Sequence, residues 1–327
     1  MKTTKKTLIL FVSIALAMLL FISFGYSAGQ DEGKESDMAV GIANHAAGNE
    51  FINNMVERMQ QRLDEYGVRY DYVVADGSLE VHNNNIENLI GKGLRVIVVI
   101  GGDADGLKPV QRMAAENNCM LISADTGLTG EAVLSDVTSD NEVIGRKMAE
   151  FLVEQLGGEG EIVIFREPFY TPTEIRWGDG AKPVFEKNPG IKIVGDTAIQ
   201  FPDGTIQARA AMETHLVAHP EIAGVWAVYD QPALGAVQSL LAAGREDVIV
   251  VGADGDQQNI VEYVAKGTIQ KATVAQNSRE MGKICAEIAV QYLRGEKTDF
   301  PEHSYAPVTL VTQDNATEFA KQQGWIE

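Results

Sequence analysis

The stretch GVWAVYDQPALGAVQSLLAAGREDVIVVGADG, residues 224–255, contains one complete strand–helix–strand unit and decides the fold. The apolar run Gly224–Tyr229 predicts a buried strand, and residues 232–243 follow with helical spacing. Gly244 stands where a glycine ends a helix, and Val248–Gly252 predicts the next strand. A helix that connects two strands in this way places them parallel in one sheet.

The same alternation continues on both sides of this unit, from residue 36 to the end of the chain. The predicted strands are Met38–Ala43, Val68–Val74, Leu94–Ile100, Cys119–Ala124, Ala132–Val137, Glu161–Phe165, Ile191–Ile199, Gly224–Tyr229, Val248–Gly252, Lys271–Ala275 and Val308–Thr312. The predicted helices are 51–66, 80–92, 106–118, 140–156, 174–187, 205–218, 232–243, 256–266 and 278–294. One sheet cannot hold all these strands, so we expect an α/β protein with two doubly wound parallel-sheet lobes and a ligand cleft between them.

The N-terminus has the order of a secretory signal peptide. Three lysines precede an apolar run from Leu8 to Phe24, and small residues follow at 27–29 before the chain becomes polar. We therefore predict a signal peptide at 1–28, although Tyr26 fits poorly three positions before that cut and leaves its position open. A retained membrane anchor is the alternative. No cysteine lies near the cut, which argues against a lipoprotein.

The chain is strongly acidic, with a formal net charge of −19. This charge disfavours contact with nucleic acid and with anionic lipid, and it favours a soluble monomer. The two cysteines, Cys119 and Cys285, lie in apolar patterns and are expected to be buried free thiols. Export to an oxidising compartment leaves a disulfide between them as the alternative.

Polar and aromatic residues gather where the predicted strands end. Ligands of open parallel sheets bind outside the carboxyl ends of the strands, so this edge is the predicted site. Carboxylates accept hydrogen bonds from neighbouring hydroxyls, arginine and amides donate them, and rings cover the apolar faces of a sugar. The predicted ligand-binding residues are Asn49, Phe51, Asp125, Thr126, Arg176, Trp177, Tyr229, Asp254 and Gln276. An aspartate at a strand end can instead cap the next helix, which stays open for Asp230 and Asp140.

The sequence shows no motif for catalysis, for a cofactor or for a metal. His215 and His219 lie four residues apart on a predicted helix, but no third ligand is evident. The segments Asp103–Gly106 and Asp254–Asp256 resemble the start of calcium loops but lack the glutamate at position 12. Gly101-Gly102 lacks the spacing of a nucleotide-binding loop. We therefore expect neither an enzyme nor a metal or cofactor site.

Four segments, taken together and in this order, resemble a known family. They are Val137-Thr-Ser-Asp140-Asn141, Ala218-His219-Pro220, Tyr229-Asp230-Gln-Pro-Ala-Leu-Gly235-Ala and Val250-Val-Gly252-Ala-Asp254-Gly255. The chain resembles the type I periplasmic binding proteins, specifically the ribose/galactose-type sugar receptors of ABC transporters, over about 38–312. The resemblance implies two lobes joined by three crossings, with lobe one at 37–139 plus 277–306 and lobe two at 140–276 plus 307–327.

The resemblance also implies roles for individual residues. Asn49 and Phe51 match the family's first-loop amide and ring, whereas Ile52 replaces a second ring. Asp125, Asp254 and Gln276 match directly. The arginine that often follows the first aspartate is Thr126 here, and an asparagine of the family is Tyr229. The second-lobe arginine falls at Arg176 or Trp177. Because Thr126, Trp177 and Tyr229 depart from the family, we expect a sugar, sugar alcohol or small polyol other than ribose.

The resemblance implies a periplasmic receptor that delivers its ligand to the permease of an ABC importer. The alternative is the same fold binding a nucleoside or a signalling furanose for a chemotaxis or kinase sensor. LacI-type regulators share this fold, but they carry a DNA-binding domain where this chain has its predicted leader. An enzyme on this fold would need a reactive cluster in the cleft.

Overall fold

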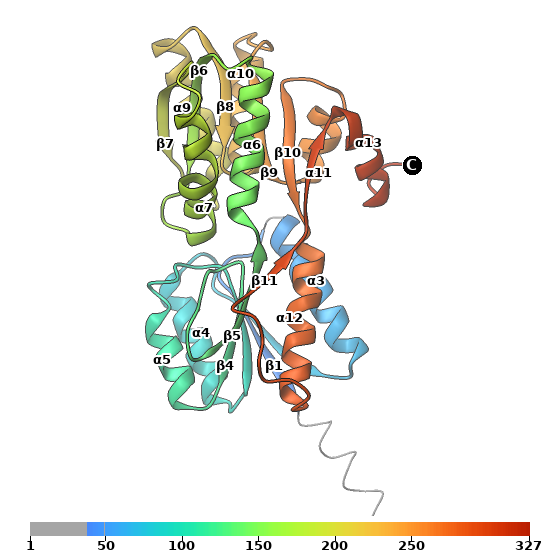
Figure 1. The fold of residues 1–327 in the computed structure, drawn as a ribbon. Helices are drawn as coiled ribbons and strands as arrows, with labels where there is room; N and C mark the ends of the chain where they lie inside the picture. Colours follow the sequence, from blue (N-terminus) through green and yellow to red (C-terminus); the bar gives the residue numbers. More distant parts are fainter. Residues whose placement is uncertain (1–37, 49) are drawn as a thin grey trace, which may run out of the picture.

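A computed structural model describes residues 38–48 and 50–327, and the predicted signal peptide lies outside them. The described chain forms two lobes, each with a six-stranded sheet covered by helices on both faces (Figure 1). The two-lobed α/β fold predicted from the sequence is therefore confirmed. Among the described helices, none has the length and apolar character needed to cross a membrane.

The first sheet has the strand order β11-β5-β4-β3-β1-β2, and all neighbouring strands are parallel. Its strands are β1 (Ala39–Asn44), β2 (Arg69–Val74), β3 (Val96–Ile100), β4 (Met120–Ala124), β5 (Val133–Ser139) and β11 (His303–Ala306). Register places Asn44 beside Ile100 and Ile100 beside Ala124. The carboxyl ends of β1, β3 and β4 therefore meet at one edge, which faces the second lobe (Figure 1).

Helices cover both faces of the first sheet, so strands such as β3 are buried throughout. On one face lie α3 (Glu50–Glu65) and α12 (Ser278–Leu293), and on the other lie α4 (Leu79–Gly91) and α5 (Lys108–Glu116). The predicted apolar stripe of α3 is buried. Cys285 packs in the α3–α12 layer and Cys119 in the α4–α5 layer, so both thiols are buried as predicted.

The second sheet has the order β12-β10-β9-β8-β6-β7, in which only β12 runs antiparallel to its neighbour β10. Its strands are β6 (Gly160–Arg166), β7 (Ile191–Ala198), β8 (Ile222–Ala227), β9 (Ile249–Asp254), β10 (Gln270–Gln276) and β12 (Val308–Thr312). The longer helices around it are α6 (Asn141–Gln155), α9 (Gly204–Ala218) and α10 (Asp230–Ala242). The unit predicted at 224–255 is thus β8–α10–β9, and Gly244 ends α10 with a φ of +68°.

The chain passes between the two sheets three times. It leaves the first sheet after β5, returns to it between β10 and β11, and leaves again between β11 and β12. The last two strands lie almost end to end, since only residue 307 separates them. Three segments of chain therefore connect the lobes beside the cleft.

Two of the predicted helices are interrupted. The helix predicted at 174–187 consists of α7 (Thr171–Ile175), the π-helical turn η1 (Arg176–Ala181) and α8 (Lys182–Glu186). This segment crosses α6 so closely that a Cβ atom on Gly145 would lie 1.7 Å from the carbonyl oxygen of Arg176. Likewise, the helix predicted at 256–266 is α11 (Gln257–Asn259) followed by the π-helical turn η2 (Ile260–Val264). Such turns are common at functional sites.

Two elements were missed by the sequence analysis, namely β11 and the C-terminal helix α13 (Gln313–Gln322). β11 is a short edge strand with two of its four residues exposed, and it lacks the apolar run by which the other strands were recognised. α13 is largely polar, and it buries only Ala316 and Ala320 in a small cluster, with Phe319 partly buried against it. Its signal was the capping box formed by Thr312 and Asn315, which satisfies the first free backbone N–H groups.

The contact between α6 and η1 predicts that Gly145→Ala destabilises the protein. The added methyl group overlaps the Arg176 carbonyl, so we expect a loss of more than about 2 kcal/mol in the free energy of unfolding. Gly91→Ala is the matched control, because a Cβ added at this helical glycine would meet no atom within 4 Å and should change stability by less than about 1 kcal/mol. Urea unfolding measures both, and equal midpoints for the two variants would contradict the close contact.

Candidate functional site

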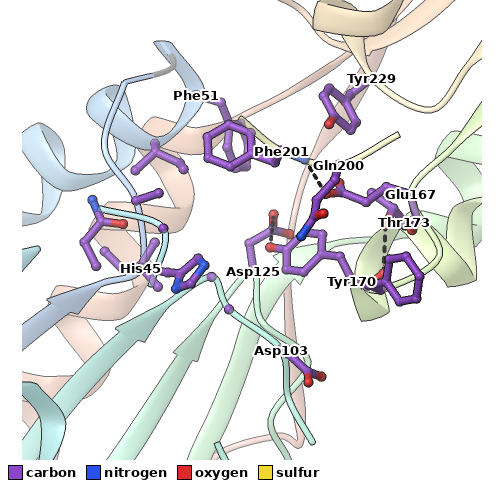
Figure 2. A pocket seen from close by; sticks show the side chains of 18 of the residues that line it. His45, Phe51, Asp103, Asp125, Glu167, Tyr170, Thr173, Gln200, Phe201 and Tyr229 are labelled. Atoms are coloured by element: carbon purple, nitrogen blue, oxygen red, sulfur yellow. Dashed lines mark hydrogen bonds between the residues drawn. The ribbon is translucent and has the colours of Figure 1, made fainter. Parts of the chain in front are cut away.

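A cavity of about 340 Å³ lies between the lobes, at the carboxyl ends of the strands of both sheets (Figure 2). Its volume is at the lower end of the range for small-molecule sites. The lining combines carboxylates, amides, one arginine and several rings. It consists of Asn44, His45, Ala46, Phe51, Ile52, Met55, Gly77, Leu79, Ile100, Gly101, Gly102, Asp103, Asp125, Glu167, Phe169, Tyr170, Thr173, Arg176, Gln200, Phe201, Tyr229, Asp254 and Gln276.

Asp125 is the buried carboxylate of the first lobe. It follows β4, has a φ of +51° and is only 6% exposed. The Thr138 hydroxyl donates to Oδ1 at 2.9 Å, and the Tyr170 phenol of the second lobe donates to Oδ2 at 3.0 Å (Figure 2). Burial raises the pKa of Asp125, while Arg176 and these two donors oppose the rise. The bond from Tyr170 joins the lobes across the cleft.

Asp254 is the corresponding carboxylate of the second lobe, at the end of β9. Its φ of +102° lies in a region that residues with a side chain rarely adopt. Gln276 donates to its Oδ1 at 2.7 Å, and Nη1 of Arg176 lies 3.5 Å from the same oxygen. Burial raises the pKa of Asp254 to about 6, although Arg176 lowers it. The cavity therefore holds this carboxylate in a fixed but energetically costly position.

Asp230 fixes the loop that carries Asp254. Its carboxylate is fully buried and accepts hydrogen bonds from the backbone N–H groups of Gly255 and Asp256, both at 2.9 Å. It also accepts from Thr273 at 2.9 Å and from Gln270 at 3.1 Å. Asp230 is therefore a structural residue, neither a helix cap nor part of the cavity lining. Asp140, by contrast, caps α6 by accepting from the N–H of Val143.

Arg176 is the one arginine in the cavity lining and is 2% exposed. Its Nε and Nη2 both donate to Oδ1 of Asn141, at 3.2 and 2.9 Å. Its Nη1 donates to the carbonyl oxygen of Val228 at 2.6 Å and faces Asp254. The protein itself thus uses most of the guanidinium donors, which holds the side chain rigidly against the cavity wall.

Two residues predicted to contact ligand are not part of the lining. Trp177 packs in the core of the second lobe against Trp226 and Phe185, with ring centroids 5.4 and 6.2 Å away. Within η1, Arg176 faces the cavity, whereas the ring of Trp177 points into the core of the lobe. Thr126 is fully buried, with its hydroxyl 3.1 Å from the carbonyl oxygens of Val99 and Ala124.

The remaining predicted residues lie as follows. Phe51, Asp125, Arg176, Tyr229, Asp254 and Gln276 all contribute to the cavity lining, from both lobes. Asn49 lies outside the described residues. The structure thus brings together six residues that are scattered over more than two hundred positions of the sequence.

The prediction missed several lining residues of the second lobe, chiefly Glu167, Tyr170 and Phe201. Glu167 is 8% exposed and accepts a hydrogen bond from the backbone N–H of Phe201 at 2.9 Å (Figure 2). Burial raises its pKa to about 6, and the charge of Asp254 adds to the rise. Both Glu167 and Phe201 follow predicted strands by two residues, so the strand-end rule could have found them.

A pair of histidines stands beside the first-lobe wall. The rings of His45, in the lining, and His82, fully buried, meet edge to face at 5.3 Å. Burial lowers the pKa of both, and that of His82 to about 4, so both are neutral at pH 7. Within residues 38–48 and 50–327 no group of three or more histidine, cysteine or acidic side chains could hold a metal ion.

Comparison with known proteins decides the family. The sequence profile of the periplasmic binding protein domain matches residues 40–297, which span both lobes. The chain belongs to this family. The resemblance found in the sequence is thereby confirmed.

The relatives of this periplasmic binding protein are sugar and polyol receptors. The ribose import binding protein of Escherichia coli is 29% identical over 76% of this chain and 82% of its own length. A xylitol-binding protein of Mycolicibacterium smegmatis is 28% identical over 82% of this chain and 76% of its own. A solute-binding protein of Agrobacterium vitis with bound allitol has 27% identity and a TM-score of 0.81, covering 87% of this chain and 98% of that one.

The buried carboxyl group of Glu167 predicts a pH dependence of stability in this periplasmic binding protein without ligand. Its pKa is about 6 in the folded protein against 4.5 unfolded, so the folded state holds the proton more tightly. Its contribution to stability is therefore present below pH 4.5 and is lost as the pH rises through 6, by about 2 kcal/mol.

Glu167→Gln removes this titration and still lets the side chain accept from the Phe201 N–H. As the pH rises from about 4 to about 7.5, the native protein should therefore lose about 2 kcal/mol more unfolding free energy than Glu167→Gln loses. Urea unfolding across this range measures it. The matched control Glu186→Gln alters an exposed carboxylate and should give a nearly constant difference. A constant difference for Glu167→Gln as well would show that its carboxyl is solvated.

Proposed function

We propose that this protein is a periplasmic solute-binding protein that captures a sugar or polyol in the interlobe cleft and delivers it to an ABC-type importer. One observation carries the proposal most directly. Hydrogen-bonding groups and aromatic rings from both lobes converge on one cavity at the carboxyl ends of the strands. That combination suits a ligand with hydroxyl groups on a compact apolar frame.

The comparisons support the same class of ligand. Relatives carry the names of ribose, xylitol and D-apiose binding proteins, and solved structures of the fold hold allitol and myo-inositol. The proposal includes a cleaved leader at 1–28, a periplasmic location, a monomeric receptor, the permease as partner and a binding role without catalysis. Burial raises the pKa of both thiols, so neither cysteine is suited to act as a nucleophile.

The proposed binding step is closure of the lobes around the ligand. We place the boundaries of the lobes at 139/140, 276/277 and 306/307, where the three crossings would act as hinges. Direct bonds between the lobes across the cleft include Tyr170 to Asp125, and the N–H of Gln257 to Glu50 at 3.1 Å. Bonds of this kind are individually weak, so a bound ligand can supply much of the free energy that keeps the lobes together.

The expectation of a ligand other than ribose was based on Thr126, Trp177 and Tyr229, and the cavity supports only part of this basis. Of the three departures from the family, only Tyr229 lines the cavity, since Thr126 and Trp177 point elsewhere. The buried Glu167 brings a further carboxylate to the wall.

Removing either aspartate of the cavity should weaken binding. Asp125→Ala and Asp254→Ala each leave ligand hydroxyl groups without acceptors in a closed cleft, so we expect at least about a tenfold rise in the Kd. Isothermal titration with the tightest member of a panel of sugars and polyols measures it. Asp105→Ala, on the exposed surface next to the cavity, should bind as the native protein does. Native affinity in both cavity variants would place the site elsewhere.

The opposite placement of Arg176 and Trp177 gives a second test. Trp177→Phe keeps an aromatic ring in the core of the second lobe and should change the Kd by less than about threefold. Arg176→Lys loses the fork that binds Asn141 and Val228, so Asp254 loses its rigid neighbour and the Kd should rise at least about tenfold. A larger rise in the Kd for Trp177→Phe than for Arg176→Lys would instead indicate that Trp177, and not Arg176, contacts the ligand.

A further inference from the structure

The charges that line the cavity do not balance. Asp125 and Glu167 are buried carboxylates, and Asp254 is largely covered, with 13% of its side chain exposed. Arg176 is the one buried cation among these lining residues, and it already faces Asp254. In the described part of the chain no ion pair reaches Asp125 or Glu167. His45 is neutral, and the fourth carboxylate of the lining, Asp103, adds negative charge at the exposed side. Burying unpaired charges of one sign is costly unless a partner arrives.

The hydrogen-bonding groups of the cavity show the same bias toward acceptors. The Oδ1 atom of Asn44, a residue only 1% exposed, accepts no hydrogen bond from the described residues, and the same is true of Oε1 of Gln276. The Tyr229 hydroxyl and Nδ1 of His45, which can donate or accept, also have no partner there. Arg176, the strongest donor of the wall, directs its N–H groups to Asn141, Val228 and Asp254. The carboxylates and the two amide oxygens therefore favour a ligand that is rich in donors.

Aromatic rings complete the surroundings of these acceptors. Figure 2 shows Phe51, Phe201 and Tyr229 around the same space as the carboxylates of Asp125 and Glu167. The faces of such rings attract cations as well as the C–H groups of sugars, and the attraction grows when water is excluded.

We propose that the ligand is a polyol or sugar that carries an ammonium group, and that Glu167 and Asp254 receive this group on the second-lobe wall. An ammonium group has three N–H donors and no acceptor, which matches the unfilled acceptors of the cavity. Its charge compensates the carboxylate excess that Arg176 leaves. The hydroxyl groups of the ligand then bind the remaining acceptors, Asp125 among them. This proposal rests on the proposed function and narrows its class of ligand.

The pKa values of Glu167 and Asp254 agree with a cation site on the second-lobe wall. Burial raises the pKa of both Glu167 and Asp254 to about 6, and the negative charge of Asp254 contributes to the rise at Glu167. The two carboxylates are therefore close enough to repel each other. A cation placed between them would turn this repulsion into attraction.

Matched pairs of compounds that differ only by an amine in place of a hydroxyl group test the proposal. The pairs are D-glucosamine with D-glucose, D-galactosamine with D-galactose, D-mannosamine with D-mannose, and 1-amino-1-deoxy-D-sorbitol with D-sorbitol. Each is titrated calorimetrically into the mature protein at about pH 7.5 and fixed ionic strength, together with the neutral polyols xylitol, allitol and myo-inositol. We expect the amine to bind at least about tenfold more tightly than its hydroxyl partner in at least one pair.

Variants assign that preference to the carboxylate. In the responding pair, Glu167→Gln should reduce the ratio of the two affinities at least about fivefold, because it removes the charge and keeps the shape. Asp105→Ala, which removes an exposed charge outside the lining, should leave the ratio unchanged. An unchanged ratio in Glu167→Gln would overturn the role of this residue.

The outcomes separate this inference from the proposed function. If neutral sugars or polyols bind and no amine binds more tightly than its partner, the inference fails while the proposed function stands. If no compound of either kind binds, both fail. Raising the salt concentration should also weaken the amine more than its neutral partner, and equal weakening would count against a charged contact.

Discussion

Four hydrogen bonds to the buried carboxylate of Asp230 hold the binding face of the second lobe together. Two come from the backbone after β9 and two from side chains of β10, so one residue at the start of α10 ties β8, β9 and β10 together. Asp254 keeps its positive φ because the next two residues are held in this way. A cluster of this kind stabilises only when every acceptor is filled, which makes it rigid.

In the first lobe, the strand register and the backbone conformation of Asp125 position the carboxylate at the cavity. Its parallel register sets the ends of β1, β3 and β4 side by side, and Asp125 leaves β4 in a left-handed conformation that turns its carboxylate toward Tyr170. Both lobes thus present a largely covered carboxylate whose position the backbone fixes before a ligand arrives. Within each lobe, such a carboxylate needs little reordering on binding. It lowers folding stability, however, since covering a carboxylate disfavours the ligand-free state at neutral pH.

The fold was predictable because its signals are local. Periodicity identified every strand of both sheets except β11, which lies at an edge and is partly exposed. It also missed the helix α13, because that helix buries only two small apolar residues of a polar sequence. The interruption at Arg176 was not predicted, although Gly178, Gly180 and Pro183 are poor helix formers. Its close approach to Gly145 on another helix appears only in the structure. Strand ends similarly located Asp125 and Asp254, and the same rule could have found Glu167, which follows a predicted strand by two residues. The burial of Glu167, however, depends on the loop that carries Phe201.

The sequence by itself determined the two-lobed architecture, the family and the edge of the sheets where the ligand site lies. Periodicity and strand order are carried by the chain, and parallel strands bring their carboxyl ends together wherever they occur. Only the tertiary structure decided which side chains face the cavity. The direction of Arg176 and Trp177 depends on how η1 packs against α6, and Thr126 turns inward because buried carbonyl groups accept its hydroxyl. The charge imbalance of the site likewise exists only once residues from both lobes share one space.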